Sequence, residues 1–187
     1  IEHCGFSSSK IMGRRSNIKV TEKHDIDYLN KFLKRGGIGF DLHKYNQGKG
    51  ITLGGVKIEC DFEIVAHSDG DVLLHSIADS ILGAAGLGDI GEHFPDTDIK
   101  NKGLDSKKII NFCLETIKNK NLEIYNIDNT IICEIPKINP HRKAILNSLS
   151  NILKFDSEKI GLKATTSEQL GIIGKNKAIA VQSFVNL

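Results

Sequence analysis

Residues 66–98, AHSDGDVLLHSIADSILGAAGLGDIGEHFPDTD, organise the rest of this chain. The stretch holds three histidines and six aspartates, and its first part has the periodicity of an amphipathic helix. Across residues 69–85 apolar side chains recur at helical spacing, whereas Asp71, His75 and Asp79 follow one another at intervals of four. The two sets centre roughly 130° apart around the helix axis. We therefore predict a helix with one face in the core and a column of carboxylate, imidazole and carboxylate on the other.

This column suits a metal ligand, because a liganding histidine needs its second ring nitrogen held by a carboxylate or carbonyl group. We take His75 as the ligand, supported by Asp71 or Asp79. A solvated helix face with a chance histidine is the alternative that the periodicity leaves open. The loop after the helix favours a binding site, because glycines let the backbone approach a ligand. Its glycines and aspartates are Gly86, Gly88, Gly91, Asp89, Asp96 and Asp98.

The composition describes an ordinary small domain. The chain has 187 residues, of which 40% are hydrophobic, enough for one good core. A net charge of +2, no Trp and only three Tyr argue against nucleic acid as a partner. No apolar run approaches the length that spans a bilayer, so we expect a soluble protein without a membrane partner. The four cysteines form no close pair, which is typical of reduced thiols.

Residues 1–34 differ from the rest in composition. They contain three consecutive serines, a pair of arginines and scattered lysines, without clean periodicity. We expect an N-terminal extension, either the remnant of a targeting segment from a longer precursor or a frayed terminus. Residues 35–187 would form the functional domain.

The domain is expected to begin at Gly36 with the strand GGIGFDLHKY. Period two places Asp41 and His43 on one face of this strand, about 7 Å apart, where they can converge on one ion. Gly54 and Gly55 predict a tight hairpin. Further strands are expected at 63–66, 122–135, 159–166 and 177–187, and helices at 105–119 and 139–153. This interleaving favours an α/β sandwich, with a mixed sheet covered by helices on one face.

The segment KATTSE, residues 163–168, has its own chemistry. Two adjacent hydroxyl groups between a lysine and a glutamate can bind phosphate oxygens and hold a hard cation. The alternative is that Thr165 and Thr166 are simply β-branched strand residues.

Four motifs carry a resemblance to a known family: GFDLH at 39–43, the stretch 66–98, IPK at 135–137 and KATTSEQLG at 163–171. On these motifs residues 35–187 resemble the 2-C-methyl-D-erythritol 2,4-cyclodiphosphate synthases, lyases of non-mevalonate isoprene biosynthesis. The resemblance implies conversion of 4-diphosphocytidyl-2-C-methyl-D-erythritol 2-phosphate to the 2,4-cyclodiphosphate. The 2-phosphate of the substrate would attack the β-phosphorus and release CMP.

The resemblance also implies roles for individual residues. A catalytic zinc with one open position would be bound by Asp41, His43 and His75. Mg²⁺ or Mn²⁺, bridging the α- and β-phosphates, would be held by Glu168, while His67 and Thr166 would stabilise the transition state. The methylerythritol part would lie among Ser68, Asp89, Gly91 and the loop from Phe94 through Asp96 to Asp98. The cytidine pocket would be built by residues 133–139, including Cys133, Ile135, Pro136 and Lys137, together with Ala164 and Thr165.

Members of the family are homotrimers with active sites between subunits, so the resemblance implies a homotrimer here. Ile38, Ile172, Lys175 and Lys177 depart from the family pattern. The last three lie near the trimer axis in the family, which puts isoprenoid binding there in doubt. The pathway and the extension together imply a plastid-type organelle such as the apicoplast, with the bacterial cytoplasm as the alternative. Two other functions stay open from the residues alone: a hydrolytic metallophosphoesterase and a binding protein with a structural zinc.

Overall fold

The computed structural model describes residue 12, residues 19–30 and residues 35–187. The chain divides into two compact units, residues 1–34 and residues 35–187. The first unit contains helix α1 (Lys23–Asn30), near whose start the Asp25 carboxylate accepts the N–H groups of Thr21 and Glu22 at 2.8 and 2.9 Å. The sequence does not predict this helix, because it is short and lacks a clear apolar period. Apart from residue 12 and residues 19–30, the expected extension lies outside the described part.

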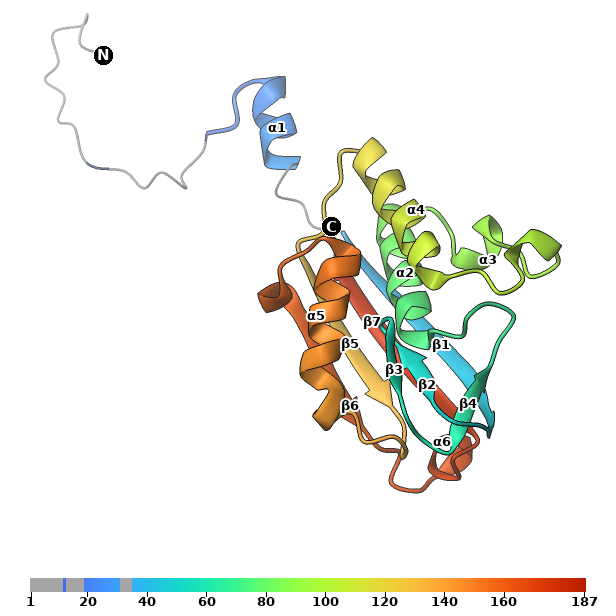
Figure 1. Ribbon diagram of the computed structural model, residues 1–187. Coiled ribbons are helices and arrows are strands. Elements are labelled where there is room, and N and C mark those ends of the chain that lie inside the picture. Colours follow the sequence, from blue (N-terminus) through green and yellow to red (C-terminus); the bar gives the residue numbers. More distant parts are fainter. Residues whose placement is uncertain (1–11, 13–18, 31–34) are drawn as a thin grey trace, which may run out of the picture. The chain divides into compact units, whose positions relative to one another are not determined.

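The second unit is built on a five-stranded mixed sheet in the order β4-β1-β7-β5-β6 (Figure 1). Strands β5 and β6 pair in parallel, and the other neighbours pair antiparallel. A separate hairpin is formed by two further strands, which turn at two glycines with φ of +58° and +76°. The strands are β1 (Gly36–Gln47), β2 (Ile51–Leu53), β3 (Val56–Ile58), β4 (Phe62–Val65), β5 (Asn126–Ile132), β6 (Ile160–Thr165) and β7 (Ala178–Asn186).

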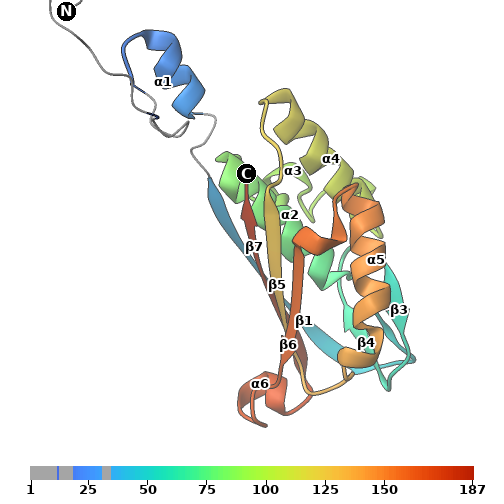
Figure 2. The same cartoon turned by 90° about the vertical axis from the view of Figure 1, so that its left-hand side faces the viewer.

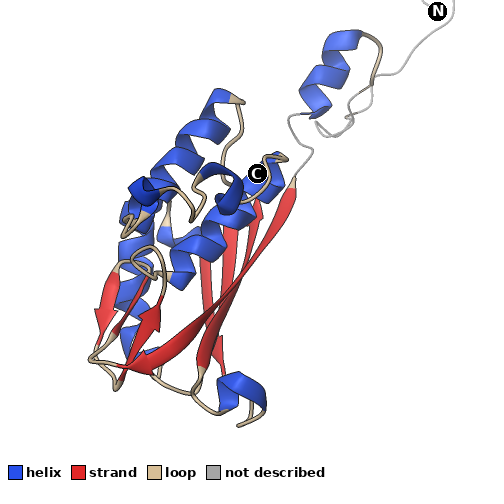
Figure 3. Ribbon diagram, turned by 90° about the vertical axis from the view of Figure 1, so that its right-hand side faces the viewer, coloured by secondary structure: helices blue, strands red, loops and turns tan. Residues whose placement is uncertain are grey.

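The three long helices of this unit lie on one face of the sheet, as Figures 2 and 3 show from opposite sides. They are α2 (Val72–Ala85), α4 (Ser106–Asn119) and α5 (Arg142–Leu153). The short helices are α3 (Ile90–His93), α6 (Gly171–Gly174), η2 (Ile99–Asn101), η3 (Asn139–His141) and η4 (Ser157–Lys159). Within residues 35–187 the opposite face of the sheet has no covering layer (Figure 2). In the part of the chain that the structure describes, no helix is both long and apolar enough to cross a membrane.

The predicted fold class and the order of elements are confirmed. The ends of the elements differ from the predicted ends mainly where polar residues flank a strand. The long strand expected at 122–135 is β5, which is seven residues long. The helix expected from Asn139 begins as the 3-10 turn η3 and continues as α5. The cysteines of the described part, Cys60, Cys113 and Cys133, are free thiols, as predicted.

Helix α2 differs from the amphipathic helix that its spacing predicts. The sheet covers one side and α4 packs against another, so nearly the whole helix is buried. Asp71 and His75, on the predicted polar column, are only 1% and 5% exposed. The periodicity cannot show this, because a polar residue on a second buried face has the same spacing as one in solvent.

Two glycines of β1 allow α2 to lie against the sheet. A Cβ atom on Gly39 would lie 1.9 Å from the backbone oxygen of Ser76, and one on Gly37 would lie 2.1 Å from that of Ser80. The Ser76 hydroxyl donates within this contact, where the carbonyl oxygens of Gly39 and Val181 lie 3.1 and 3.2 Å away. The helix backbone therefore touches the strand backbone, and the side chains beside these glycines meet those of α2.

We predict that Gly39→Ala lowers the free energy of unfolding by at least about 2 kcal/mol, because the methyl group has no space beside Ser76. Gly83→Ala is the matched control on α2, since its Cβ would meet only one atom, at 3.9 Å. Helix propensity makes that variant neutral or up to about 1 kcal/mol more stable. Urea unfolding of both variants is the measurement. Equal stability of Gly39→Ala and the parent chain would contradict the close contact.

Candidate active site

The predicted metal ligands Asp41, His43 and His75 lie together. One side-chain donor atom from each lies within 4.8 Å of those of the other two. The Oδ2 atom of Asp41 is 2.9 Å from Nε2 of His43 and 3.1 Å from Nδ1 of His75. Asp41 and His43 project from the face of β1 that meets α2, as the period of the strand predicts, and His75 meets them from the helix.

The remaining nitrogen of each imidazole is also held. Nδ1 of His43 is 3.3 Å from the carbonyl oxygen of Val65, and Nε2 of His75 is 2.9 Å from the Ser106 hydroxyl and 3.1 Å from that of Ser68. The Ser106 hydroxyl donates in turn to the Asp69 carboxylate. When Ser106 donates to Asp69, its oxygen accepts the Nε2 proton of His75. This arrangement leaves Nδ1 of His75 unprotonated, with its lone pair on the side of Asp41 and His43, where a metal ion would bind.

The predicted support of His75 by Asp71 or Asp79 is wrong, because both carboxylates bind backbone N–H groups elsewhere. Asp71 caps α2 and accepts from Gly54 at 2.8 Å and Gly55 at 2.6 Å, which ties the β2–β3 hairpin to the helix. Burial raises the pKa of Asp71 to about 6, although these N–H groups favour the charged form. Asp79 accepts from the backbone N–H of Ile90 at 2.8 Å and so positions α3.

The charges of the ligand group favour an ionised carboxylate. Burial acts to raise the pKa of Asp41, but when the rings of His43 and His75 carry the proton their hydrogen bonds and charges outweigh it and hold that pKa well below its usual range. Burial acts to lower the pKa of His43, yet the hydrogen bond and charge of Asp41 raise it overall. A divalent cation would take the place of the protons between the Asp41 carboxylate and the two imidazoles, because the negative charge of the carboxylate attracts it in the same way.

This donor set fits a metal ion of borderline softness. Two imidazoles and one carboxylate match the three protein ligands of a catalytic zinc site, which keeps its fourth position for substrate or water. A structural site would offer four protein ligands, and three are grouped here within the described residues. The donor chemistry thus favours a reactive metal centre over a structural one.

A cavity of about 480 Å³ adjoins the ligand group. Residues expected in the site make up most of its lining: Asp41, His43, His67, Ser68, His75, Gly91, Phe94, Pro95, Asp96 and Thr97. The lining also includes four residues that no sequence motif indicates: Ile90, Asn101, Leu104 and Ile109.

Two expected members of this site, Asp89 and Asp98, do not line the cavity. Asp89 caps α3 and accepts the backbone N–H of Glu92, whereas Asp98 caps η2 and accepts that of Lys100, both at 3.0 Å. Their side chains shape the loop over the cavity through its backbone. An Asp before a short helix has the same sequence signature as an Asp in a binding loop.

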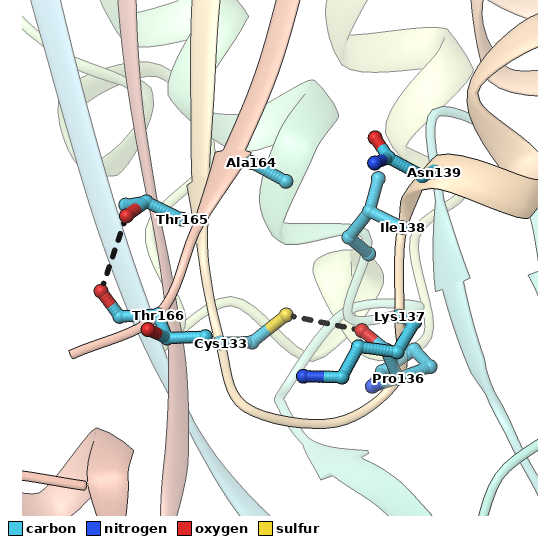
Figure 4. Close-up of a pocket in the computed structure, with 8 residues that line it drawn as sticks. All are labelled: Cys133, Pro136, Lys137, Ile138, Asn139, Ala164, Thr165 and Thr166. Atoms are coloured by element: carbon cyan, nitrogen blue, oxygen red, sulfur yellow. Dashed lines mark hydrogen bonds between the residues drawn. The ribbon is translucent and has the colours of Figure 1, made fainter. Parts of the chain in front are cut away.

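A second pocket, of about 220 Å³, lies between the loop after β5 and the end of β6 (Figure 4). Its lining consists of Cys133, Pro136, Lys137, Ile138, Asn139, Ala164, Thr165 and Thr166, all of them expected in the site. Two residues of the expected segment 133–139 do not line the pocket: Glu134, and Ile135, whose carbonyl oxygen accepts from the Tyr45 hydroxyl at 2.9 Å. The two pockets have no lining residue in common.

Glu168 lies in the turn after β6, just outside the lining of the second pocket. Its carboxylate is exposed and accepts a hydrogen bond from the Thr166 hydroxyl at 2.8 Å. A hydroxyl and a carboxylate at the edge of a pocket are suitable ligands for a phosphate and its counter-cation.

Sequence reasoning missed Asp69 and Ser106 as partners of His75. Asp69 lies within the motif, but the helical period draws attention to Asp71 instead. Ser106 is separated from His75 by the whole acidic loop, and its only sequence signal is its place at the start of a helix. Their contact depends on α4 packing beside α2, which the sequence does not reveal.

Comparisons with known proteins agree on one family. A model of the YgbB family matches residues 34–187. A bifunctional enzyme IspD/IspF from Aliarcobacter butzleri is 44% identical over 184 residues, which cover 95% of this chain and 49% of that protein. A 2-C-methyl-D-erythritol 2,4-cyclodiphosphate synthase from Pseudomonas fluorescens is 46% identical over 149 residues, which cover 80% of this chain and 95% of that protein.

A solved structure is also similar. IspF from Plasmodium falciparum, in a complex with CDP, superposes with a TM-score of 0.73 at 40% identity and covers 82% of this chain and 94% of its own. The chain spans about half the length of the bifunctional relatives that it matches.

We predict that Ser106→Ala lowers zinc affinity by about 10- to 100-fold, because Nε2 of His75 loses the nearer of its two hydroxyl partners and, with it, the link to Asp69 that fixes its tautomer. Asp79→Asn is the matched control, since it keeps an oxygen for the Ile90 N–H and should leave zinc affinity unchanged. Competition with a chromophoric chelator measures both. Equal affinities for Ser106→Ala and the parent chain would show that the serine does not support the ligand.

We also predict that zinc affinity falls as the pH is lowered through the raised pKa of His43. A proton on this imidazole blocks the nitrogen that the ion needs, so metal binding is strong above that pKa and weakens below it. The expected slope is about tenfold in affinity per pH unit for one competing proton. Affinities measured from about pH 8 to about pH 6 test this, and a flat profile would contradict His43 as a ligand.

Proposed function

The chain belongs to the YgbB family, and on this premise we propose that residues 35–187 form a 2-C-methyl-D-erythritol 2,4-cyclodiphosphate synthase. The reaction converts 4-diphosphocytidyl-2-C-methyl-D-erythritol 2-phosphate to the cyclic diphosphate and CMP. One observation carries the proposal: the grouping of Asp41, His43 and His75 on the wall of a cavity of about 480 Å³. The names of the relatives supply the substrate class.

Asp41, His43 and His75 would hold zinc. When bound, zinc acts as a Lewis acid that polarises the β-phosphate toward attack. The residues around it bring the 2-phosphate and the β-phosphorus of one molecule into line, so no protein nucleophile is required. His67, at this cavity, would donate to phosphate oxygens, while Ser68 and Gly91 would lie beside the methylerythritol part, which the glycine lets the backbone approach.

The second pocket would take the cytidine. Its size, about 220 Å³, its apolar wall and the Lys137 ammonium group suit a nucleoside with phosphates attached. Figure 4 shows Lys137, Thr165 and Thr166 around this pocket, from the loop after β5 and the end of β6. The similar structure from P. falciparum is a CDP complex, which supports this assignment.

Thr166 would donate to the reacting phosphates, and Glu168 would help to hold Mg²⁺ or Mn²⁺, which would supply positive charge beside the diphosphate. The hydrogen bond between these two side chains keeps them on the same side of the turn. The positive charge of the cation would offset the negative charge that develops on the departing CMP.

A homotrimer with shared sites would explain the bare face of the sheet. Its exposed apolar side chains include Ile38 and Phe40, at 65% and 57% exposure, together with Leu42 and Phe184. A contiguous apolar area of this kind on a small domain favours association. The zinc cavity and the cytidine pocket share no residue within one chain, so a neighbouring subunit would complete each site.

The sequence relatives reported above are bacterial. The bifunctional enzyme matches 95% of this chain, so the similarity extends into residues before Arg35, whereas the P. falciparum structure covers 82%. We therefore favour the bacterial cytoplasm over the apicoplast as the compartment, and assign residues 1–34 as an extension of the catalytic domain.

Product analysis tests the activity. Incubation with the substrate, Zn²⁺ and Mg²⁺ should give CMP and a cyclic diphosphate in equal amounts. Phosphorus NMR detects both products. His75→Ala should lose zinc and activity together, which controls for a contaminating enzyme. A linear phosphate as the product would support the hydrolytic alternative and overturn the synthase assignment.

Subunit mixing tests the shared site. His75→Ala and Thr166→Val chains should each be inactive alone, yet co-refolding should restore activity, because about a quarter of the interfaces then carry neither lesion. Mass spectrometry shows whether mixed trimers form. Mixed trimers without recovered activity would place each site within one chain.

A further inference from the structure

The turn that follows β6 is anchored by one carboxylate from the neighbouring loop. Oε1 of Glu134 accepts the backbone N–H groups of Ser167 and Gln169, both at 3.1 Å, and lies 3.4 Å from the Ser167 hydroxyl. Glu134 follows Cys133 in the loop after β5. A single oxygen therefore binds donors from both sides of Glu168.

This anchor acts where the backbone is strained. Glu168 and Gln169 have φ of +53° and +62°, the left-handed region that side chains with a Cβ atom rarely adopt. Two such residues in succession persist only where surrounding interactions determine the conformation. The two backbone N–H groups that Glu134 accepts belong to Ser167 and Gln169, the residues on either side of Glu168. The charge of a carboxylate makes them stronger than bonds to a neutral acceptor.

The strained conformation decides where Glu168 points. With the turn held, its carboxylate accepts from the Thr166 hydroxyl and lies at the edge of the second pocket. If the turn relaxed to ordinary backbone angles, the side chain of Glu168 would leave Thr166. Packing on the far side restricts other arrangements, because a Cβ atom on Gly174 would lie 2.0 Å from the carbonyl carbon of Gln169.

We propose that Glu134 is a positioning residue, which presents Glu168 to the divalent cation of the diphosphate by holding the 167–169 turn. The proposal rests on the proposed function, since it takes from it the cation and the CDP portion of the substrate. Glu134 itself need not touch the ion. It acts through the backbone of the turn, and the side chain of Glu168 makes the contact.

Amide hydrogen exchange tests the anchor without any ligand. Glu134→Ala should exchange the Ser167 and Gln169 amides about tenfold faster or more, because their acceptor is gone. Glu134→Gln should keep most of the protection, since an amide oxygen accepts the same bonds. Glu123→Ala, which removes an exposed carboxylate from another loop, is the matched control and should change neither amide. Unchanged exchange in Glu134→Ala would overturn the proposal.

Nucleotide binding then tests the role. In the parent chain Mn²⁺ should tighten CDP binding but not CMP binding, because only CDP offers two phosphates to bridge. Glu134→Ala should lose about tenfold or more of the Mn²⁺ effect on CDP and keep its affinity for CMP and its zinc, whereas Glu134→Gln and Glu123→Ala stay close to the parent.

Other outcomes have separate meanings. Equal loss of CMP and CDP affinity would make Glu134 a wall of the nucleoside pocket and overturn its positioning role. A full Mn²⁺ effect in Glu134→Ala would also overturn it, while leaving the synthase assignment intact. A parent chain that shows no Mn²⁺ effect on CDP would overturn the second cation site and, with it, this proposal.

Discussion

The contact between the backbone of α2 and the two glycines of β1 is the constraint on which the rest of the structure depends. Gly37 and Gly39 have no side chains, so the backbone of α2 at Ser80 and Ser76 lies closer to the strand than a residue with a Cβ atom would allow. At this distance His75 reaches the Asp41 carboxylate two residues along from Gly39. The grouping of Asp41, His43 and His75 is thus a consequence of how the core packs.

Carboxylates that bind backbone N–H groups hold the surrounding loops in place. Asp71 joins the hairpin to α2, Asp79 joins α3 to α2, and Glu134 joins the turn after β6 to the loop after β5. Each satisfies donors that the loops would otherwise leave unpaired. The carboxylates around the site therefore serve two purposes. Some line the cavities, and the others hold loops in place through backbone N–H groups.

Much of the fold follows from the sequence, because strand and helix periods, the Gly54-Gly55 turn and the capping residues are local signals. The D-x-H spacing in β1 predicts two metal ligands for the same reason. Packing partners could not be predicted: Ser106 meets His75 only because α4 lies beside α2, and Asp71 turns toward the hairpin. The anchoring role of Glu134 depends in the same way on contacts between segments distant in sequence.

A crystal structure of the chain with zinc and CDP would test the central claim most directly. Anomalous scattering at the zinc edge should give one strong peak per subunit, between the carboxylate of Asp41, Nε2 of His43 and Nδ1 of His75, with an oxygen of CDP in the fourth position. The cytosine should lie in the pocket between Cys133 and Thr165, on a neighbouring subunit. A zinc ion with four protein ligands, or CDP bound away from these pockets, would contradict the account.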